Sequence, residues 1–307
     1  MGMNTKLSIA IFSLCLFSNY VQGQNSKTPT LLIDQNELTI SCDGRAVLIY
    51  SFRSVPAKPY VKILRSPSGV NILRDAPHDH LHHHGLMFAL KVNGTDFWAE
   101  TSSTGRQVHK SFQNVDVSVK DQNSEATFTS AIDWVEAASK KIILKEKRVL
   151  SLRQSKEVTL LTWNTILKTP RNIGQVKIGG DHYFGLGMRF LQSMDKDGTF
   201  TNTDGKAGKI FRGTERLTPA NWCAYHALAG GKPVTVAMFD HPDNFKPATW
   251  FTMLEPFSYL SATLKYHERS FVLKSEDNLS LTYGIAVWDG KPEKAVIEQA
   301  YQNWLKQ

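Results

Sequence analysis

The sequence predicts an all-β protein, a large antiparallel β-sandwich with one C-terminal helix. Apolar and polar residues alternate with a period of two in several segments, which is the pattern of half-buried strands. Convincing helical spacing occurs only over residues 293–305. Many short strands with turn residues between them form sandwiches or barrels. Neither a repeat nor a linker interrupts residues 30–307, so we expect residues 24–307 to form one domain.

The first residues predict an export signal. Met1 to Lys6 supply a weakly positive start, and Leu7 to Phe17 form an apolar stretch. Val21-Gln22-Gly23 then offers suitable residues for cleavage before Gln24, so residues 1–23 read as a secretory signal peptide. The apolar stretch is too short for a comfortable membrane span, and no other stretch of the sequence is long enough. We therefore expect an exported protein, periplasmic or extracellular, without a membrane span.

The predicted strands begin with a hairpin. Asn93-Gly94 lies between Leu86–Val92 and Asp96–Glu100, and Asn-Gly readily takes positive φ, which suits a hairpin turn. Four further segments have strand character: 126–134, 158–167, 233–239 and 279–287. The predicted helix over 293–305 follows Pro292 and gathers its apolar residues on one face: Ile297, Ala300, Tyr301 and Trp304.

Charge and cysteine usage restrict the class of protein. The net charge is +8, but Lys and Arg are spread along the chain, which argues against a nucleic-acid partner. The densest run, residues 140–148, alternates with apolar residues as a solvated strand face would. An anionic polysaccharide is compatible with this charge. Cys42 and Cys223 could bridge, but one pair does not make a disulfide scaffold, so the hydrophobic core must carry the fold.

A histidine cluster is the most informative local feature. Residues 78–84 hold five of the ten histidines in the chain. Histidine titrates near neutral pH and binds transition metals through a neutral ring nitrogen. In an extended segment the even-numbered residues from His78 to His84 would share one face, with neighbours roughly 6–7 Å apart, so two could hold one ion or one sugar ring. The alternative is a polar loop whose histidines bond to backbone carbonyls.

Three Asp-His pairs extend the candidate site: Asp79-His80, Asp181-His182 and Asp240-His241. A neighbouring carboxylate can orient an imidazole and fix its tautomer, as metal and acid–base sites require. Each pair also has a structural alternative, because Asp-His-Pro is a good turn and His182 could cap a loop. The resulting catalytic candidates are His80, His83, Asp181, His182, Asp240 and His241. We expect the histidine cluster to lie near His182 or His241 in one concave site.

Further residues are candidates for binding. The set proposed to contact substrate comprises Asp79, His84, Arg189, Asn244, Trp222 and Trp250. Tryptophans can stack on sugar rings, although most in a β protein belong to the core. His80 and His82 form a His-x-His pair similar to strand-borne pairs that bind zinc or iron, so a divalent metal is a possible cofactor. The serine-hydrolase elbow, the phosphate-binding loop and the Cys-x-x-Cys pair are absent from the sequence.

Three motifs resemble the PmoA-like family of exported bacterial proteins. These motifs are Arg65–Gly69, Asp79–Leu86 and Val92–Trp98, beside a family pattern of Ser-Pro-x-Gly, Asp-His-x-His-His-Arg-x-Leu and Val-Asn-Gly-x-Asp-Phe-Trp. Further matches follow in order: Gly185–Arg189, Arg212-Gly213, Trp222–His226, Asp240–Phe245, Pro247 and Trp250. The resemblance covers most of residues 55–305. His84 departs from it, since the family commonly has Arg there, and this weakens an anion-clamp role at that position.

The resemblance implies a large sugar-handling β-sandwich, of the supersandwich kind that galactose mutarotases have. Members of the family accompany sugar oxidoreductases and isomerases, which implies work on carbohydrate. The leading hypothesis is therefore an exported enzyme that acts on a sugar or oxidised glycoside by elimination, hydration or hydrolysis. A glycan-binding protein without turnover is the alternative. The family label, taken from a methane oxygenase subunit, implies a third possibility, a metal-dependent oxygenase.

Overall fold

The computed structural model describes residues 28–55, 57–195 and 197–307. The signal peptide expected at residues 1–23 lies outside the described residues. The described chain consists mainly of strands, and all pairings between them are antiparallel. The predicted all-β class is confirmed.

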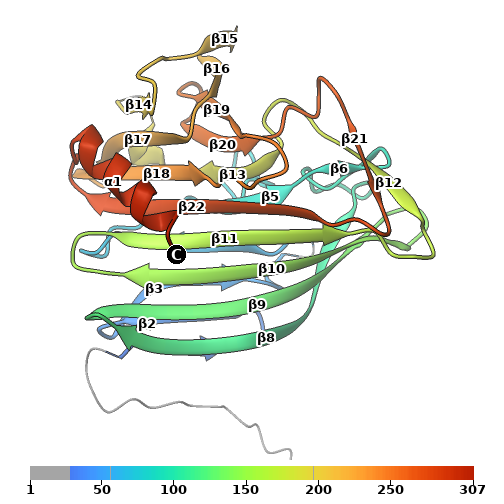
Figure 1. Ribbon diagram of the computed structural model, residues 1–307, viewed down its shortest axis with the longest axis horizontal. Helices are drawn as coiled ribbons and strands as arrows, with labels where there is room; N and C mark the ends of the chain where they lie inside the picture. Colours follow the sequence, from blue (N-terminus) through green and yellow to red (C-terminus); the bar gives the residue numbers. More distant parts are fainter. Residues whose placement is uncertain (1–27, 56, 196) are drawn as a thin grey trace, which may run out of the picture.

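Three sheets can be followed through the described residues (Figure 1). The ten-stranded sheet has the spatial order β1 (Thr30–Ile33), β2 (Glu37–Cys42), β3 (Arg45–Ser51), β4 (Tyr60–Leu64), β5 (Leu86–Ala89), β13 (Gly185–Arg189), β20 (Tyr259–Thr263), β19 (Thr249–Met253), β16 (Glu215–Pro219) and β15 (Lys209–Arg212). The eight-stranded sheet has the order β14 (Thr199–Asn202), β17 (Trp222–Ala229), β18 (Lys232–Asp240), β22 (Leu279–Asp289), β11 (Thr159–Lys168), β10 (Ile142–Gln154), β9 (Asn123–Val135) and β8 (Arg106–Lys120). The four-stranded sheet comprises β21 (Phe271–Lys274), β12 (Gln175–Gly179), β6 (Lys91–Val92) and β7 (Thr95–Asp96).

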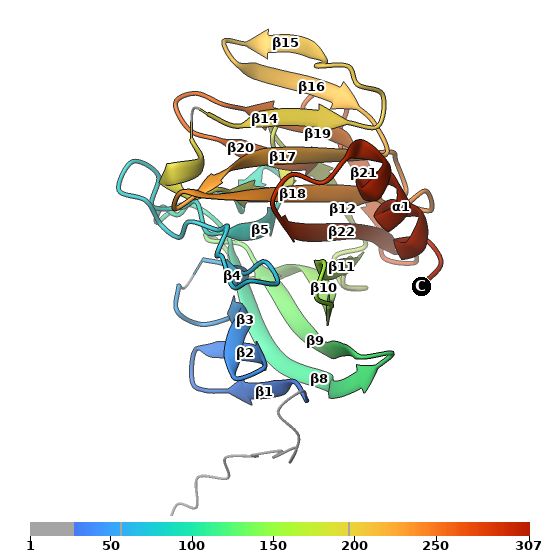
Figure 2. The ribbon, with the colours of Figure 1, turned by 90° about the vertical axis from the view of Figure 1, so that its left-hand side faces the viewer.

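The two large sheets pack against each other around the main hydrophobic core, which makes the fold a β-sandwich (Figure 2). Tyr50 of β3 packs on Phe128 of β9, with ring centroids 5.2 Å apart. Phe88 of β5 meets Trp134 of β9 at 6.1 Å. Every second residue of β9 near these contacts is buried, as its alternating sequence predicts.

The predicted C-terminal helix is present as α1 (Lys294–Trp304). Its buried residues Ile297, Tyr301 and Trp304 belong to a second hydrophobic cluster with Trp222 and Phe239 of the eight-stranded sheet. The helix therefore covers part of one sheet face (Figure 1). Its length and apolar face agree with the spacing in the sequence.

The Asn93-Gly94 hairpin forms, but its second strand is shorter than predicted. Asn93 and Gly94 have φ of 50° and 84°, as this turn requires. The strand ends at Asp96, because the Asp96 Oδ1 atom accepts a hydrogen bond of 2.6 Å from the backbone N–H of Trp98. The chain turns there, so the segment up to Glu100 is not the strand that its sequence predicts.

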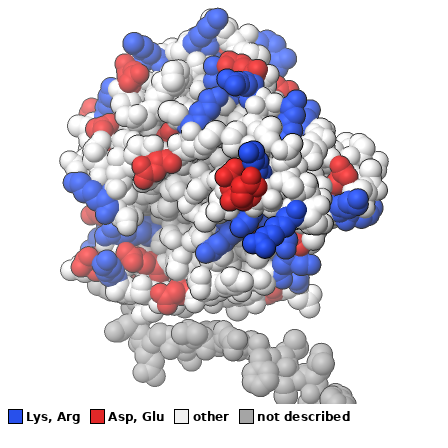
Figure 3. Space-filling model, turned by 45° about the vertical axis from the view of Figure 1, so that its right-hand side comes forward, with Lys and Arg blue, Asp and Glu red and all other residues white. Residues whose placement is uncertain are grey.

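The distribution of charged side chains and the length of the helices can be compared with what the sequence indicates. On the face seen in Figure 3, basic and acidic side chains are interspersed. Among the helices of the described residues, none is long and apolar enough to cross a membrane.

Cys42 and Cys223 do not bridge, since both are free and buried. Burial raises the pKa of the Cys42 thiol to about 11 and also raises the pKa of Cys223.

Candidate active site

The candidate site lies on the face of the ten-stranded sheet that points away from the sandwich core. Leu186 of β13 lies opposite Phe88 of β5 in the register, and Phe88 packs on Trp134 of the other sheet. Side chains alternate along a strand, so Arg189 of β13 and its partner Tyr259 of β20 face outward. Loops gather over this outward face.

A cavity of about 400 Å³ opens there. Its polar lining comprises His80, His82, His83, Arg212 and Glu215. Its apolar lining comprises Trp98, Tyr183, Phe251, Met253, Pro256, Phe257 and Tyr259. Gly187 makes room for one of these rings, because a Cβ atom at that position would lie 2.0 Å from the Tyr259 hydroxyl. Flat aromatic faces beside a few polar groups are the usual composition of a small-molecule site.

The histidine cluster forms two successive turns, and the extended arrangement considered from the sequence is wrong. The N–H of His80 donates to the carbonyl of Pro77, and the N–H of His83 donates to the carbonyl of His80, each at 2.9 Å. His80, His82 and His83 therefore meet at the cavity. His78 is exposed, and His84 is not part of the cavity lining. Alternation on a strand cannot produce this grouping.

His83 is the most deeply placed histidine of the cavity. Its ring stacks on His80, with centroids 4.6 Å apart, and lies edge-on to Trp98 and Phe257. Burial, reinforced by the neighbouring His82 and His80, lowers the pKa of His83 to about 2. His83 is therefore a neutral hydrogen-bonding group at physiological pH and a poor proton acceptor, which changes its predicted catalytic role into a binding role.

His82 is half-buried at the cavity. Burial and then the positive charge of Lys58 lower the pKa of His82. The imidazole is thus neutral near pH 7 and has a free lone pair, as a general base needs. His80 also lines the cavity, and its Nδ1 atom lies 3.2 Å from Asp79 Oδ2.

A chain of four polar side chains reaches the cavity, and two of them, Arg212 and Glu215, line it. His182 Nδ1 lies 2.6 Å from Asp181 Oδ1, and His182 Nε2 lies 3.2 Å from Glu215 Oε2. Arg212 Nη2 donates to Glu215 Oε1 at 2.6 Å. A neutral imidazole has one N–H and can donate to only one carboxylate. The imidazole of His182 bridges the two carboxyl groups, and Glu215 connects this unit to the cavity.

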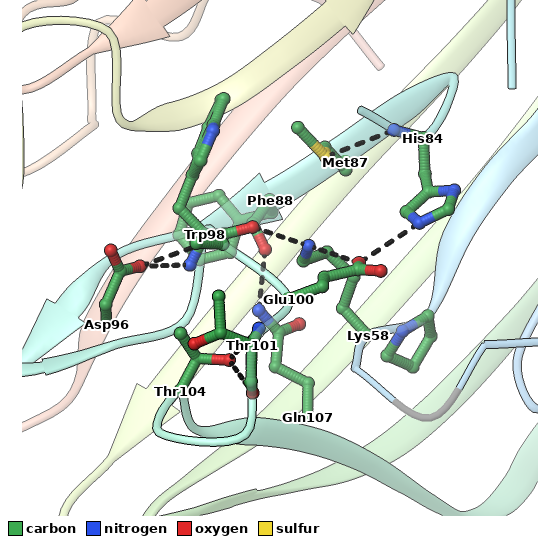
Figure 4. Close-up of polar contacts among 12 residues, drawn as sticks. Lys58, His84, Met87, Phe88, Asp96, Trp98, Glu100, Thr101, Thr104 and Gln107 are labelled. Carbon is green, nitrogen blue, oxygen red and sulfur yellow. Dashed lines mark hydrogen bonds and ion pairs between the residues drawn. The ribbon is translucent and has the colours of Figure 1, made fainter. Parts of the chain in front are cut away.

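A second polar network joins His84, Glu100, Lys58 and the backbone of Trp98 (Figure 4). His84 Nδ1 lies 2.7 Å from Asp75 Oδ1, and His84 Nε2 lies 3.0 Å from Glu100 Oε1. Lys58 Nζ donates to Glu100 Oε1 and to the carbonyl of Trp98, both at 2.7 Å. Burial alone would lower the pKa of His84, but its bonds to Asp75 and Glu100 raise it above the usual value. The network ties the histidine turns to Trp98, a wall of the cavity, and assigns His84 a supporting role.

Arg189 lies beside the cavity without a complete set of partners. Its guanidinium carbon is 3.4 Å from the ring centre of Phe257, and Nη2 is 3.4 Å from Asp79 Oδ2. Trp98 Nε1, His83 Nδ1 and the Tyr259 hydroxyl are also buried without a hydrogen-bond partner among the described residues. A polar ligand would supply the partners that these groups lack.

The third Asp-His pair does not join the cavity. Asp240 accepts hydrogen bonds from the backbone N–H of Ala248 at 2.8 Å and from Asn244 Nδ2 at 2.7 Å. Asp240 and Asn244 thus stabilise the loop that follows β18. His241 packs beside Trp304 of α1, with ring centroids 5.5 Å apart. The expected roles of Asp240, His241 and Asn244 at one site with the histidine cluster are therefore wrong for this cavity.

The two tryptophans predicted to bind substrate are core residues. Trp222 is fully buried beneath α1, and its Nε1 donates to Glu298. Trp250 is fully buried, and its Nε1 donates to the carbonyl of Ala220. Neither has a ring face available for a sugar, so this expectation is corrected. Trp98 is the tryptophan that lines the cavity.

The residues present do not fit a metal centre. Across residues 28–55, 57–195 and 197–307, no group of three or more His, Cys, Asp or Glu side chains could hold a metal ion. The rings of His80 and His82, the pair considered as ligands, have centroids 5.8 Å apart and an interplanar angle of 59°. His80 and His82 alone are too few ligands for a tetrahedral site. The tentative metal assignment is not supported by this geometry.

Several residues of the site carried no signal in the sequence. Glu215 begins the short strand β16, and Phe257 lies in the connection between β19 and β20; spacing in such short segments indicates neither orientation nor contact. Lys58 and Glu100 are charged residues in segments that appear solvated from sequence, yet Lys58 is 1% exposed. Tyr183 directly follows the Asp181-His182 pair in the sequence, and this adjacency is the one signal that could have identified it as a site residue.

Residues 37–302 match the model of DUF6807, described as a family of unknown function. The match spans most of the chain, so the protein belongs to this family. No curated protein matches the chain. The solved structures that are similar to this chain include the following three. A putative aldose 1-epimerase from Klebsiella pneumoniae has 11% identity and a TM-score of 0.48, over 90% of this chain and 87% of that one.

A galactose mutarotase-like protein from Clostridium acetobutylicum has 9% identity and a TM-score of 0.41, over 84% of this chain and 94% of that one. A GH36 α-galactosidase from Geobacillus stearothermophilus has 8% identity and a TM-score of 0.45, over 86% of this chain. The match spans 39% of the length of that α-galactosidase.

Proposed function

We propose that this protein is an exported, carbohydrate-active enzyme that transforms a sugar or oxidised glycoside by acid–base chemistry. Elimination, hydration and hydrolysis each need one group that takes a proton and another that gives one. The observation that carries the proposal is the placement of both kinds of group at one cavity. His82 is a half-buried imidazole with a lowered pKa, and Glu215 lines the same cavity in contact with His182 and Arg212.

The roles follow from the contacts. His82 accepts a proton from the ligand, and Glu215 donates one, while Asp181 fixes the orientation of His182 behind it. His83 and Trp98 bind the ligand through polar atoms that lack protein partners. The aromatic rings of Tyr183 and its neighbours offer apolar faces to the C–H side of a sugar ring. The resemblance to the PmoA-like family supports carbohydrate as the substrate class.

The test is product formation by the purified protein. Incubation with glycosides and their 3-keto derivatives should give a product detectable by mass spectrometry. Glu215→Gln should slow its formation by roughly 10²–10⁴-fold, because the proton donor is lost. Glu255→Gln is a matched control, since Glu255 is an exposed glutamate outside the lining of this cavity.

A glycan-binding protein without turnover is the second candidate, favoured by the unpartnered polar atoms that line the cavity. Calorimetric binding of a glycoside with unchanged ligand after prolonged incubation would select this alternative. Absence of both binding and product would remove both candidates.

A further inference from the structure

Arg189 is a buried cation that the protein leaves largely without partners. The residue is 1% exposed, and among the described residues only the long 3.4 Å contact with Asp79 bonds its guanidinium. Its Nε and Nη1 atoms have no hydrogen-bond partner within the described chain. Buried charges are normally paired and hydrogen-bonded, because the loss of hydration is otherwise uncompensated. The Nε and Nη1 atoms of Arg189 are therefore available to bind a negatively charged group.

One aromatic ring separates this guanidinium from the cavity. Arg189 lies opposite Tyr259 in the register and shares its outward face, and Tyr259 lines the cavity. Phe257 also lines the cavity, and the guanidinium carbon rests 3.4 Å from its ring centre. Phe257 lies in the connection between β19 and β20, next to the exposed residues Glu255 and Pro256. Rotation of this ring requires no break in a strand.

We propose that Arg189 binds a carboxylate of the ligand once the Phe257 ring turns aside, so that the ligand is an acidic sugar such as an aldonate or uronate. This inference rests on the proposed function and adds the substrate class. The contact with Asp79 involves Nη2, so Nε and Nη1 are the nitrogens that receive the ligand. An ionised carboxylate is the common partner of guanidinium and gives stronger hydrogen bonds than a neutral hydroxyl.

Calorimetry with D-glucuronate, D-galacturonate and D-gluconate against D-glucose and D-galactose tests the inference. At least one acid should bind the wild type about tenfold or more tightly than the neutral sugars, because hydrogen bonds to charged groups are the stronger ones. Arg189→Met should lose about 10–100-fold of that affinity and the preference for acids. Arg189→Lys retains the charge and should retain part of the preference. The matched control is Arg65→Met, since Arg65 also has an unpartnered Nε but does not line the cavity.

Each outcome decides one of the two ideas. Equal affinity for acidic and neutral sugars, or an intact preference in folded Arg189→Met, overturns the acidic-sugar inference and leaves the proposed function standing. If Arg189→Met does not fold, the Arg189 side-chain Nε–H resonance of the wild type replaces it. That resonance, identified by its absence in Arg189→Lys, should shift with an acid and stay unchanged with glucose. Absence of binding to every sugar of the panel, together with absence of product from glycosides, rejects both.

Discussion

His80 and His83 stack almost face to face at the wall of the cavity, with ring centroids 4.6 Å apart and an interplanar angle of 25°. Two imidazoles in this arrangement cannot both carry a charge without strong repulsion. The lowered pKa of His83, about 2, is consistent with this geometry and has burial as its main cause. The His83 ring is therefore neutral and lies with one face against His80.

The histidines at the cavity should matter for the ligand more than for stability. His80→Ala and His82→Ala are expected to weaken ligand binding or activity, while the melting temperature changes little, because neither imidazole is fully buried. Thermal unfolding and calorimetry on both variants provide the measurement. If both variants melted several degrees lower with unchanged affinity per folded molecule, the cluster would be structural.

His84 should behave in the opposite way. His84→Ala leaves Asp75 and Glu100 without the imidazole that bridges them, so we expect the free energy of unfolding to fall by about 3 kcal/mol. Urea denaturation measures this loss. His78→Ala, an exposed histidine two residues before His80, serves as the control and should change stability by less than about 0.5 kcal/mol. Equal stability of the two variants would contradict the role assigned to the network.

Asp181 should act on the reaction through His182. Asp181→Asn removes the carboxylate that holds His182 Nδ1, so the imidazole is no longer fixed in its orientation toward Glu215. We expect kcat to fall about 10–100-fold, as for other residues that orient a catalytic side chain, with KM nearly unchanged. Steady-state kinetics across a pH series would separate this role from a structural one, since only a proton-transfer role moves the pH profile.

Acid should destabilise the fold through its buried neutral histidines. Burial lowers the pKa of His226 to about 4, whereas an unfolded histidine titrates near 6.5. The unfolded chain therefore binds this proton first. The stabilising contribution is complete above pH 6.5 and is lost as pH falls toward 4, by at most about 1.4 kcal/mol per pH unit for each such residue.

His226→Gln isolates this effect, because His226 packs between Thr201 and Thr235, outside the lining of the cavity. The slope of unfolding free energy against pH, measured in urea between pH 7 and 4.5, should be smaller in the variant. An identical slope would show that His226 does not titrate as its burial implies. His84 has the opposite sign, since its raised pKa gives stability that is lost as pH rises.

The sequence predicts the fold better than the site because alternation is a local property and convergence is not. Burial of every second residue in β9 and the apolar face of α1 follow directly from spacing. Glu215 shares the cavity with the histidine turns, whereas His182 contacts Glu215 and is not part of the cavity lining. Glu215 reaches His182 from a separate strand, and only the tertiary fold places the two together. Asp240 precedes a histidine, as Asp181 does. Its carboxylate instead accepts a hydrogen bond from the backbone N–H of Ala248, in the loop that follows β18.

The cavity face rests on β5, β13 and β20, three adjacent strands drawn from residues 86–89, 185–189 and 259–263. Pairing them closes chain loops of many tens of residues, which is entropically costly and makes folding slow in proteins dominated by such contacts. The binding surface consequently cannot form in a nascent or truncated chain before the last of these strands is available. Ligand binding should therefore appear late in refolding, together with the completed ten-stranded sheet, and would report on the folding of the whole sheet rather than of any part.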